Sequence, residues 1–193
     1  MPVVYAPAIR DSGLGGVLLG CQYVVGEGTF ISERVIGLLR CTETARALYD
    51  SIGCALEMGC GASAAWAFDF DDCTYAMLTS QRETVRGDSI GLASFASLIA
   101  AVDGSAFRRV KLAASAAIRI TKGRWCCEAV ADIRRKASLA RDSSIDVFYV
   151  SAAQRREMSG FDSGSTNVVF LPADMKAATR VLLASLREHA SPN

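Results

Sequence analysis

The stretch that decides the fold is Arg86-Gly87-Asp88-Ser89-Ile90-Gly91-Leu92, followed by the apolar run Ala93-Ser94-Phe95-Ala96-Ser97-Leu98-Ile99-Ala100-Ala101-Val102. Leu92, Phe95 and Ile99 recur at helical spacing, so the run predicts a buried helix entered through a glycine-containing turn. Ser89 would lie where the turn meets the helix, beside free backbone N–H groups that can stabilise a negatively charged oxygen. The alternative is that Asp88 or Ser89 simply caps the helix, as both residue types often do.

The composition is that of a globular protein. Apolar residues make up 51% and aromatic residues 8% of the 193 residues, which is enough for one domain with a substantial core. A formal net charge of +1 gives no sign of the concentrated basic face that nucleic-acid binding needs. No apolar stretch reaches the length that spans a bilayer, and the first residues lack the features of a secretion signal. We therefore expect neither nucleic acid nor a membrane as a partner.

The cysteines and the histidine argue against a metal centre. The seven cysteines form no C-x-x-C pair, and His189 is the one histidine, so we expect no metal site. An odd number of cysteines, several inside apolar segments, is typical of reduced and mostly buried residues in an intracellular protein. The glycines form no phosphate-binding loop, so we expect no ATPase module and no cofactor.

The same inventory limits which residue could activate a nucleophile. His189 lies close to the C-terminal end of the sequence, where segments often fray, so it is a poor candidate for a firmly held base. Lysine is the alternative, because a buried ammonium group can lose its proton near neutral pH. Lys136 falls in a predicted helix over 128–141, near Ile133 and Ala140 on the apolar stripe. The competing interpretation is a solvated basic run, Arg134-Arg135-Lys136.

The remaining elements predict a mixed α/β class in a single domain over residues 1–193. Asp71 and Asp72 lie at the tip of a predicted hairpin formed by 65–70 and 73–78, where a divalent cation bound by these residues and Asp69 is the alternative. The other expected elements are an extended lead-in over 1–12, strands over 17–25 and 29–31, a helix over 42–58, strands over 110–121, 125–127 and 145–150, a loop over 159–165, a strand over 167–171 and a helix over 172–189.

The order of these elements and three short motifs resemble the proteolytic domain of the Lon family, and more specifically the stand-alone Lon-like proteases that birnaviruses encode within their polyproteins. Gly87-Asp88-Ser89, followed by Gly91 and a buried helix, is similar to the family's nucleophile turn. Lys136, followed by a short helical tail and the strand over 145–150, is similar to the family's lysine. The segment around Ser115 resembles the strand whose small hydroxyl residue, more usually threonine, approaches the lysine amine.

The chain departs from the family in three places. The separation between Ser89 and Lys136 is somewhat longer than in the family. Ala131-Asp132-Ile133 stands where Lon enzymes usually carry a glycine pair, and Ile90 replaces the usual small residue after the nucleophile. Together with the lack of an ATPase module, these departures favour a divergent viral-type enzyme over a fragment of a cellular Lon.

The resemblance implies a Lon proteolytic-domain-like fold, with mixed sheets and packed helices, and a serine endopeptidase that works without ATP. Ser89 would be the nucleophile and Lys136 the base of a catalytic dyad. Gly87 and Asp88 would form the oxyanion turn, and Ser115 would orient the lysine. The substrate would be a viral polyprotein cut at small-residue junctions in the host cytoplasm, with self-association left open.

Three other interpretations remain at this point. The first is a non-catalytic scaffold or binding domain of the same fold, in which Ser89 is only a helix cap and Lys136 a surface charge. The second is the proteolytic domain of a divergent cellular Lon-like protein. The third, a small-molecule transferase, has no cofactor fingerprint behind it.

Overall fold

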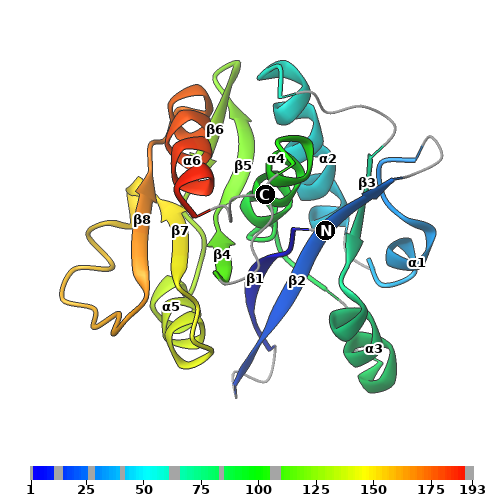
Figure 1. Ribbon diagram of the computed structural model, residues 1–193, viewed down its shortest axis with the longest axis horizontal. Coiled ribbons are helices and arrows are strands. Elements are labelled where there is room, and N and C mark those ends of the chain that lie inside the picture. Colours follow the sequence, from blue (N-terminus) through cyan, green and yellow to red (C-terminus); the bar gives the residue numbers. More distant parts are fainter. Residues whose placement is uncertain are drawn as a thin grey trace.

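The computed structural model describes residues 2–10, 15–25, 29–39, 42–60, 66–82, 85–104 and 110–189, which form a mixed α/β fold (Figure 1). The strands are β1 (Val4–Ile9), β2 (Gly16–Val25), β3 (Trp66–Phe70), β4 (Leu112–Ser115), β5 (Ala117–Thr121), β6 (Arg124–Glu128), β7 (Val147–Ser151) and β8 (Asn167–Leu171). The helices are α1 (Glu33–Ile36), α2 (Thr42–Glu57), α3 (Asp72–Gln81), α4 (Gly91–Val102), α5 (Ile133–Asp142) and α6 (Met175–His189), with a 3-10 turn over Ala152–Gln154.

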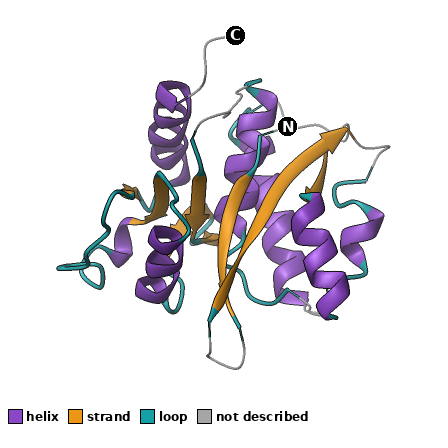
Figure 2. Ribbon diagram, turned by 60° about the horizontal axis from the view of Figure 1, so that its bottom comes forward, coloured by secondary structure: helices purple, strands orange, loops and turns teal. Residues whose placement is uncertain are grey.

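Six strands form one mixed sheet in the order β3-β2-β1-β4-β7-β8. The β1, β2 and β3 strands pair antiparallel, and Figure 2 shows β1 and β2 side by side as a long ladder. From β1 onward the pairing is parallel, through β4 and β7 to β8. A separate two-stranded sheet is formed by β5 and β6, which the chain enters directly from the end of β4.

Helices cover both faces of the sheet, and side-chain alternation along β4 separates the two cores. Leu112 and Ala114 of β4 pack in the larger core, together with the side chains of α2, α4 and α6. Ala113 points the other way, into a smaller core with Ile133 and Ala137 of α5. In Figure 1, α6 and α5 accordingly lie on opposite sides of β7. A side chain at the end of β4 therefore reaches either the α4 side or the α5 side, depending on its position.

Several predicted elements are confirmed. The strand over 17–25 is β2, the helix over 42–58 is α2, the apolar run after Ser89 is α4, and the strand over 167–171 is β8. The loop over 159–165 contains no helix or strand. The mixed α/β class is therefore confirmed.

The predicted hairpin after residue 65 is wrong in its second half. Trp66–Phe70 is a strand, but the chain then forms α3 instead of returning. The cause is Asp71, whose carboxylate accepts a hydrogen bond from the backbone N–H of Thr74 at 2.8 Å and so caps the helix. Asp72 then lies in the first turn, where the helix dipole favours a negative charge.

Four other boundaries differ from the prediction. Residues 4–9, within the expected extended lead-in, form the inner strand β1, whereas 11 and 12 lie outside the described residues. The expected strand over 29–31 is only a single bridge from Ile31 to Phe68, followed by α1. The strand over 110–121 is interrupted at Ala116, whose carbonyl accepts from Leu92. The helix over 128–141 begins at Ile133, because Glu128 still pairs within the β5–β6 hairpin.

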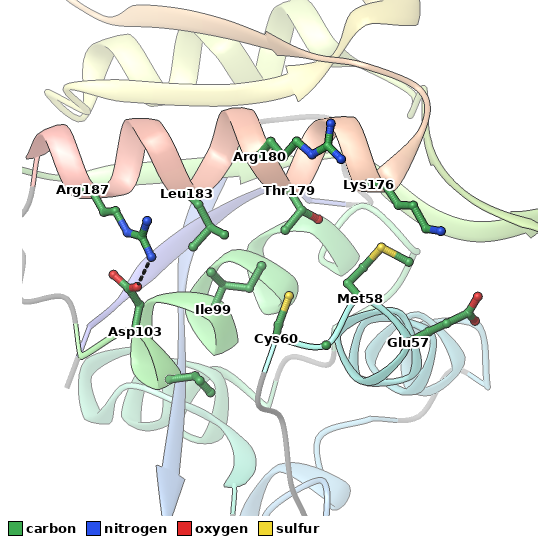
Figure 3. Close-up of a pocket in the computed structure, with 12 residues that line it drawn as sticks. Glu57, Met58, Cys60, Ile99, Asp103, Lys176, Thr179, Arg180, Leu183 and Arg187 are labelled. Carbon is green, nitrogen blue, oxygen red and sulfur yellow. Dashed lines mark hydrogen bonds and ion pairs between the residues drawn. The ribbon is translucent and has the colours of Figure 1, made fainter.

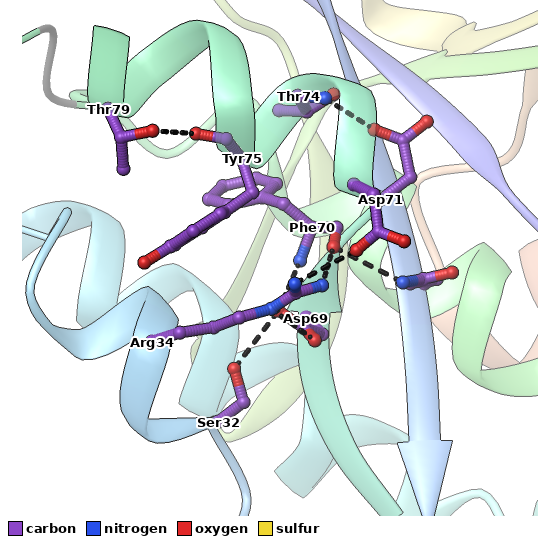
Figure 4. Close-up of polar contacts among 10 residues, drawn as sticks. Ser32, Arg34, Asp69, Phe70, Asp71, Thr74, Tyr75 and Thr79 are labelled. Atoms are coloured by element: carbon purple, nitrogen blue, oxygen red, sulfur yellow. Dashed lines mark hydrogen bonds and ion pairs between the residues drawn. The ribbon is translucent and has the colours of Figure 1, made fainter.

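The aspartates near the end of β3 form an ion-pair cluster with Arg34 of α1 (Figure 4). The guanidinium of Arg34 donates to both oxygens of Asp69 at 2.8 Å, to Asp72 at 2.9 Å and to the carbonyl of Phe70 at 2.7 Å. It also stacks on the ring of Tyr75, 4.8 Å from its centroid. This Arg34 cluster ties α1 to the β3–α3 corner. Among the described residues no group of acidic, histidine or cysteine side chains could hold a metal ion.

None of the helices in the described part of the chain is both long enough and apolar enough to cross a membrane.

Candidate active site

Ser89 is half-buried in the turn that leads into α4, one residue before the N-cap position. The N-cap residue is Ile90, and no side chain caps the helix. Among the described residues the Ser89 hydroxyl has no hydrogen-bond partner, and the Asp88 carboxylate binds Arg119 instead of the helix end. The alternative of a helix cap is therefore wrong for both residues.

The turn is held from two sides. Thr44 of α2 donates its hydroxyl to the carbonyl of Gly87 at 3.0 Å, and Ser51 donates to the carbonyl of Gly91 at 2.8 Å. From the other side, the backbone N–H of Leu92 donates to the carbonyl of Ala116 at 3.1 Å. The position of Ser89 is thus fixed by α2 and by the junction between β4 and β5.

The backbone favours glycine at two positions of this turn. Gly87 has φ +90°, in the left-handed region that residues with a side chain rarely adopt. Gly91 packs so closely that a Cβ there would lie 3.3 Å from the backbone nitrogen of Ile118. The glycine spacing around Ser89 is thus explained by backbone conformation and by close packing.

Free backbone N–H groups surround Ser89. Within the described part of the chain, no group accepts a hydrogen bond from the backbone N–H of Asp88, Ser89 or Ile90. Such free donors are expected at a helix N-terminus, where the helix dipole also favours negative charge. The turn therefore offers a hydroxyl next to donors that could bind a developing oxyanion.

Lys136 is buried, as its place on the apolar stripe predicts. Its side chain is only 7% exposed and lies in the first turns of α5, where Ile133, Ala137 and Ala140 are also buried. The interpretation as a solvated run is therefore wrong for Lys136, although Arg134 and Arg135 are exposed. Burial lowers the pKa of the Lys136 amine below its usual range, because the charged form loses water.

Two carboxylates oppose this effect. The negative charges of Asp132 and, more weakly, Asp88, the neighbour of Ser89, raise the pKa of Lys136, but less than burial lowers it. Among the described residues no hydrogen bond joins the amine of Lys136 to Ser89 or to Ser115.

Ser115 lies on the α5 side of the sheet. It is the last residue of β4 and shares its face with Ala113, which packs against Ile133 and Ala137. Its side chain is fully buried, and its Oγ has no hydrogen-bond partner among the described residues. A buried hydroxyl without a partner is uncommon, and it is available to a group that enters the site.

The backbone before α5 turns at Asp132. Asp132 adopts φ 58°, a left-handed conformation that glycine reaches most easily and aspartate tolerates. Asp132 thus provides a glycine-like bend, together with a negative charge near Lys136.

A groove of about 690 Å³ begins at Asp88 and runs between α2 and β5. Its lining is strongly charged and includes Glu43, Arg119 and Glu128. Arg119 donates a hydrogen bond to Asp88, and its guanidinium nitrogen lies 3.8 Å from a carboxylate oxygen of Glu43. We call this the α2–β5 groove; it could accommodate an extended polypeptide beside the Ser89 turn.

A second cavity, of about 760 Å³, lies between the C-terminal parts of α2 and α4 and the helix α6 (Figure 3). Arg187 there pairs with Asp103 at 2.9 Å, and Leu183 and Ile99 form part of an apolar wall. None of Ser89, Ser115 and Lys136 lines this cavity. These three residues do not line the α2–β5 groove either, but that groove reaches the Ser89 turn through Asp88, whereas this cavity does not.

The described cysteines and the histidine lie outside the candidate site. Cys21, Cys54 and Cys127 are buried without disulfides, whereas Cys73 is exposed, and Cys41 lies outside the described residues. Burial raises the pKa of these three buried thiols, which keeps them protonated. His189 is the last residue of α6, two residues after Arg187, which pairs with Asp103 at the C-terminal end of α4, whereas Ser89 precedes the N-terminal end of α4.

Two residues that shape the site escaped the sequence analysis. Thr44 binds the Gly87 carbonyl, and Arg119 binds Asp88. Arg119 lies between two isoleucines in a predicted strand, and this alternation identifies no partner for its side chain. Its contact with Asp88 depends on how the β5–β6 hairpin crosses the start of α4, and no local pattern reports that.

The sequence matches no protein-family model, and a search of the curated proteins finds no match.

Proposed function

We propose that this chain is a serine endopeptidase with a Lon-like proteolytic fold, in which Ser89 is the nucleophile and Lys136 the general base. The observation that carries the proposal is the burial of the Lys136 amine, which lowers its pKa. The negative charge of Asp88, the residue before Ser89, opposes this shift only in part. A lysine in such surroundings can lose its proton near neutral pH and accept one from a hydroxyl. The described part of the chain offers no histidine at the site for this role.

In the proposed mechanism, uncharged Lys136 removes the proton from Ser89 Oγ while that oxygen attacks a peptide carbonyl carbon. The resulting oxyanion accepts hydrogen bonds from the free backbone N–H groups of the turn, Asp88 and Ser89 among them. The protonated lysine then delivers the proton to the leaving amine as the carbon–nitrogen bond breaks. Water, deprotonated by Lys136 in the second half of the reaction, releases the acyl group from Ser89.

Ser115 would orient the amine of Lys136. Its hydroxyl lies on the α5 side of the sheet and is buried without a partner, so it can accept a hydrogen bond from the lysine without first breaking another bond. The substrate we propose is a polypeptide lying in the α2–β5 groove. Cleavage of a viral polyprotein at small-residue junctions, without ATP, follows from the resemblance to the birnavirus enzymes.

The test is cleavage of a fluorogenic peptide with alanine before the scissile bond. We expect Ser89→Ala and Lys136→Ala each to reduce cleavage at least a thousandfold while circular dichroism shows an intact fold. The matched controls are Ser80→Ala on α3 and Lys176→Ala on α6, both at exposed positions, and His189→Ala. These three variants should cleave like the wild type. Normal cleavage by Lys136→Ala, or loss of cleavage in His189→Ala, would contradict the dyad.

A further inference from the structure

The cavity between α2, α4 and α6, which we call the α6 cavity, has an apolar wall that the fold leaves partly uncovered. Met58, Val102 and Leu183 line it, and each packs against the main core while remaining partly exposed. Figure 3 shows Leu183 of α6 pointing toward Ile99 of α4, with Met58, which follows α2, at the same opening. The volume of about 760 Å³ is within the usual range for small-molecule sites, and an apolar group placed there would remove this wall from water.

The charged side chains of the α6 cavity are unevenly paired. They are Glu57, Asp103, Lys176, Arg180 and Arg187. Asp103 pairs with Arg187 at 2.9 Å, and Glu57 accepts a hydrogen bond from the indole N–H of Trp125 at 2.6 Å. Both carboxylates therefore have a partner within the fold. Among the described residues no ion pair joins either of them to Lys176 or Arg180.

Lys176 and Arg180 are two cations of the cavity that the fold does not neutralise. In the described part of the chain, neither side chain forms a hydrogen bond or an ion pair. They lie four residues apart on α6, so they share one face of the helix and their like charges repel each other. Asp174 caps the start of α6 by accepting from the backbone N–H of Ala177 at 3.0 Å, and it pairs with neither cation. An anion bound beside both cations would replace this repulsion with attraction.

We propose that the α6 cavity binds a small anionic amphiphile, with its carboxylate or phosphate head beside Lys176 and Arg180 and its aliphatic chain along the apolar wall. From Arg180 to Arg187 the helix rises about 10 Å, which is enough for a chain of medium length. The ion pair between Asp103 and Arg187 marks the far end of this path. Since neither Ser89 nor Lys136 lines the cavity, the inference does not depend on the proposed protease activity.

The first test is a titration of the protein with decanoate, followed by NMR of ¹³C-labelled methionine methyl groups. The sequence has five methionines, and each signal is identified by its loss when that residue is replaced by leucine. We expect the signal of Met58 to shift progressively to saturation. The signals of Met77 on α3 and Met158 in the smaller core should stay fixed. No shift of the Met58 signal at about 1 mM decanoate, the weak end of specific binding, would overturn the proposal.

Ligands with the same chain and a different head separate the charge from the chain. Decanol, which has no charge, should bind at least about tenfold more weakly than decanoate. Decyltrimethylammonium, which has a positive head, should bind more weakly still. Decyl phosphate distinguishes the two anionic heads, and the tighter of it and decanoate identifies the preferred one. If the cationic ligand bound as tightly as decanoate, the site would select only the chain and the proposal would be wrong.

A double variant tests the two cations that hold the head. Replacing both Lys176 and Arg180 by glutamine should weaken decanoate binding at least about tenfold and leave decanol binding unchanged. The matched control replaces Lys111 and Arg156 by glutamine, because both are exposed and neither lines the cavity. This control removes the same net charge and should bind decanoate like the wild type. An equal loss in both double variants would show that only the net charge attracts the ligand, and the site would be refuted.

Two substitutions at Leu183 test whether the chain lies in the cavity. Leu183→Trp places a larger apolar side chain at a partly exposed position of the wall, so it should fill the space and abolish decanoate binding. Leu183→Gln keeps the size of the side chain but makes it polar, and it should weaken binding about fivefold or more. Circular dichroism checks that each variant is folded. Wild-type affinity in a folded Leu183 variant would mean that the chain binds elsewhere, which would overturn the proposal.

Discussion

The Arg34 cluster and the candidate active site are both polar and both partly buried, but their hydrogen bonding differs. Arg34 binds Asp69, Asp72 and the Phe70 carbonyl, and Asp69 also accepts from Ser32 at 3.0 Å (Figure 4). Every charge in that cluster has a partner. In the candidate site, by contrast, the hydroxyls of Ser89 and Ser115 have no partner among the described residues, and Lys136 is buried against apolar side chains.

The difference separates a fully paired network from one with unpaired groups. A buried polar group that finds all its partners within the fold stabilises the fold and is not free to react. A buried group left without partners costs stability, and such groups concentrate where a substrate completes the network. The Arg34 cluster should therefore matter for stability, and Ser89, Ser115 and Lys136 for activity. Four substitutions can break or sharpen this contrast.

The largest expected change is in the Arg34 cluster. Arg34→Ala leaves the buried Asp69 carboxylate without its main partner, so the free energy of unfolding should fall by about 2–3 kcal/mol. Urea denaturation measures the change. Arg46→Ala serves as the control, because its ion pair with Asp50 at 3.7 Å is solvent-exposed and should contribute almost nothing. Equal stability of the two variants would show that the Arg34 cluster is not a structural network.

Ser115→Ala should lower activity without lowering stability, the reverse of what we expect for Arg34→Ala. It removes an orphan buried hydroxyl, so stability should stay the same or rise, while kcat should fall about ten- to hundredfold, or about 1.4–2.7 kcal/mol. The control is Ser185→Ala, which takes a hydrogen-bond partner at 2.9 Å from the hydroxyl of Tyr149. That variant should lose stability and keep its activity. If Ser115→Ala lost stability as Ser185→Ala does, the Ser115 hydroxyl would stabilise the fold, and the contrast with the Arg34 cluster would fail at this residue.

The pH dependence of stability tests the buried charge of Lys136. Its pKa is lower in the folded than in the unfolded chain, so between the two values the unfolded chain binds more protons and stability rises with pH. Below that window the full cost of charging the buried amine applies. Lys136→Met should therefore be more stable than the wild type at pH 7, by about 1–2 kcal/mol. The gain should shrink as the pH approaches about 10.4.

Thermal unfolding of wild type and Lys136→Met from pH 6 to 10 checks this expectation. Lys176→Met, at an exposed position, should show no gain at any pH. A constant difference between Lys136→Met and the wild type over the whole range would mean that Lys136 keeps its charge state on unfolding.

The smallest expected effect is at Gly87. Nothing lies within 4 Å of a Cβ built there, so Gly87→Ala should cost only the strain of placing alanine at φ +90°, about 1 kcal/mol. Gly37→Ala is the control, because Gly37 has helical φ −63° and its nearest neighbour would be 3.9 Å away. Chemical denaturation measures the free energy of unfolding of the two variants. Equal losses would show that an alanine at position 87 does not strain the turn before Ser89.

Periodicity predicted the helices of this fold better than the strands. The apolar spacing after Ser89 and the stripe through Ile133 each gave a helix that the structure confirms. The β1 strand was missed because Pro2 and Pro7 obscured its pattern, and because its two neighbours in the sheet come later in the chain. The α3 helix was missed because Asp71 is equally suited to a turn and to a helix cap.

The candidate site divides in the same way. The burial of Lys136 follows from its position relative to Ile133 and Ala140, so the sequence was sufficient for it. The burial of Ser115 follows from the apolar strand that it ends. The contact between Asp88 and Arg119 does not follow from any local pattern, because it depends on the crossing of the β5–β6 hairpin over α4.

The position of β1 has a consequence for how the molecule could be divided. Within the described sheet, β1 pairs with β2 on one side and with β4 on the other, so it is the seam between an N-terminal half and a C-terminal half. Ser89 belongs to the first half, and Ser115 and Lys136 belong to the second. Strand β1 carries none of these three residues, but it is the strand that joins and aligns the two halves of the sheet. A split version of the molecule, cut between α4 and β4, should assemble only when the fragment that carries Ser89 retains residues 4–9.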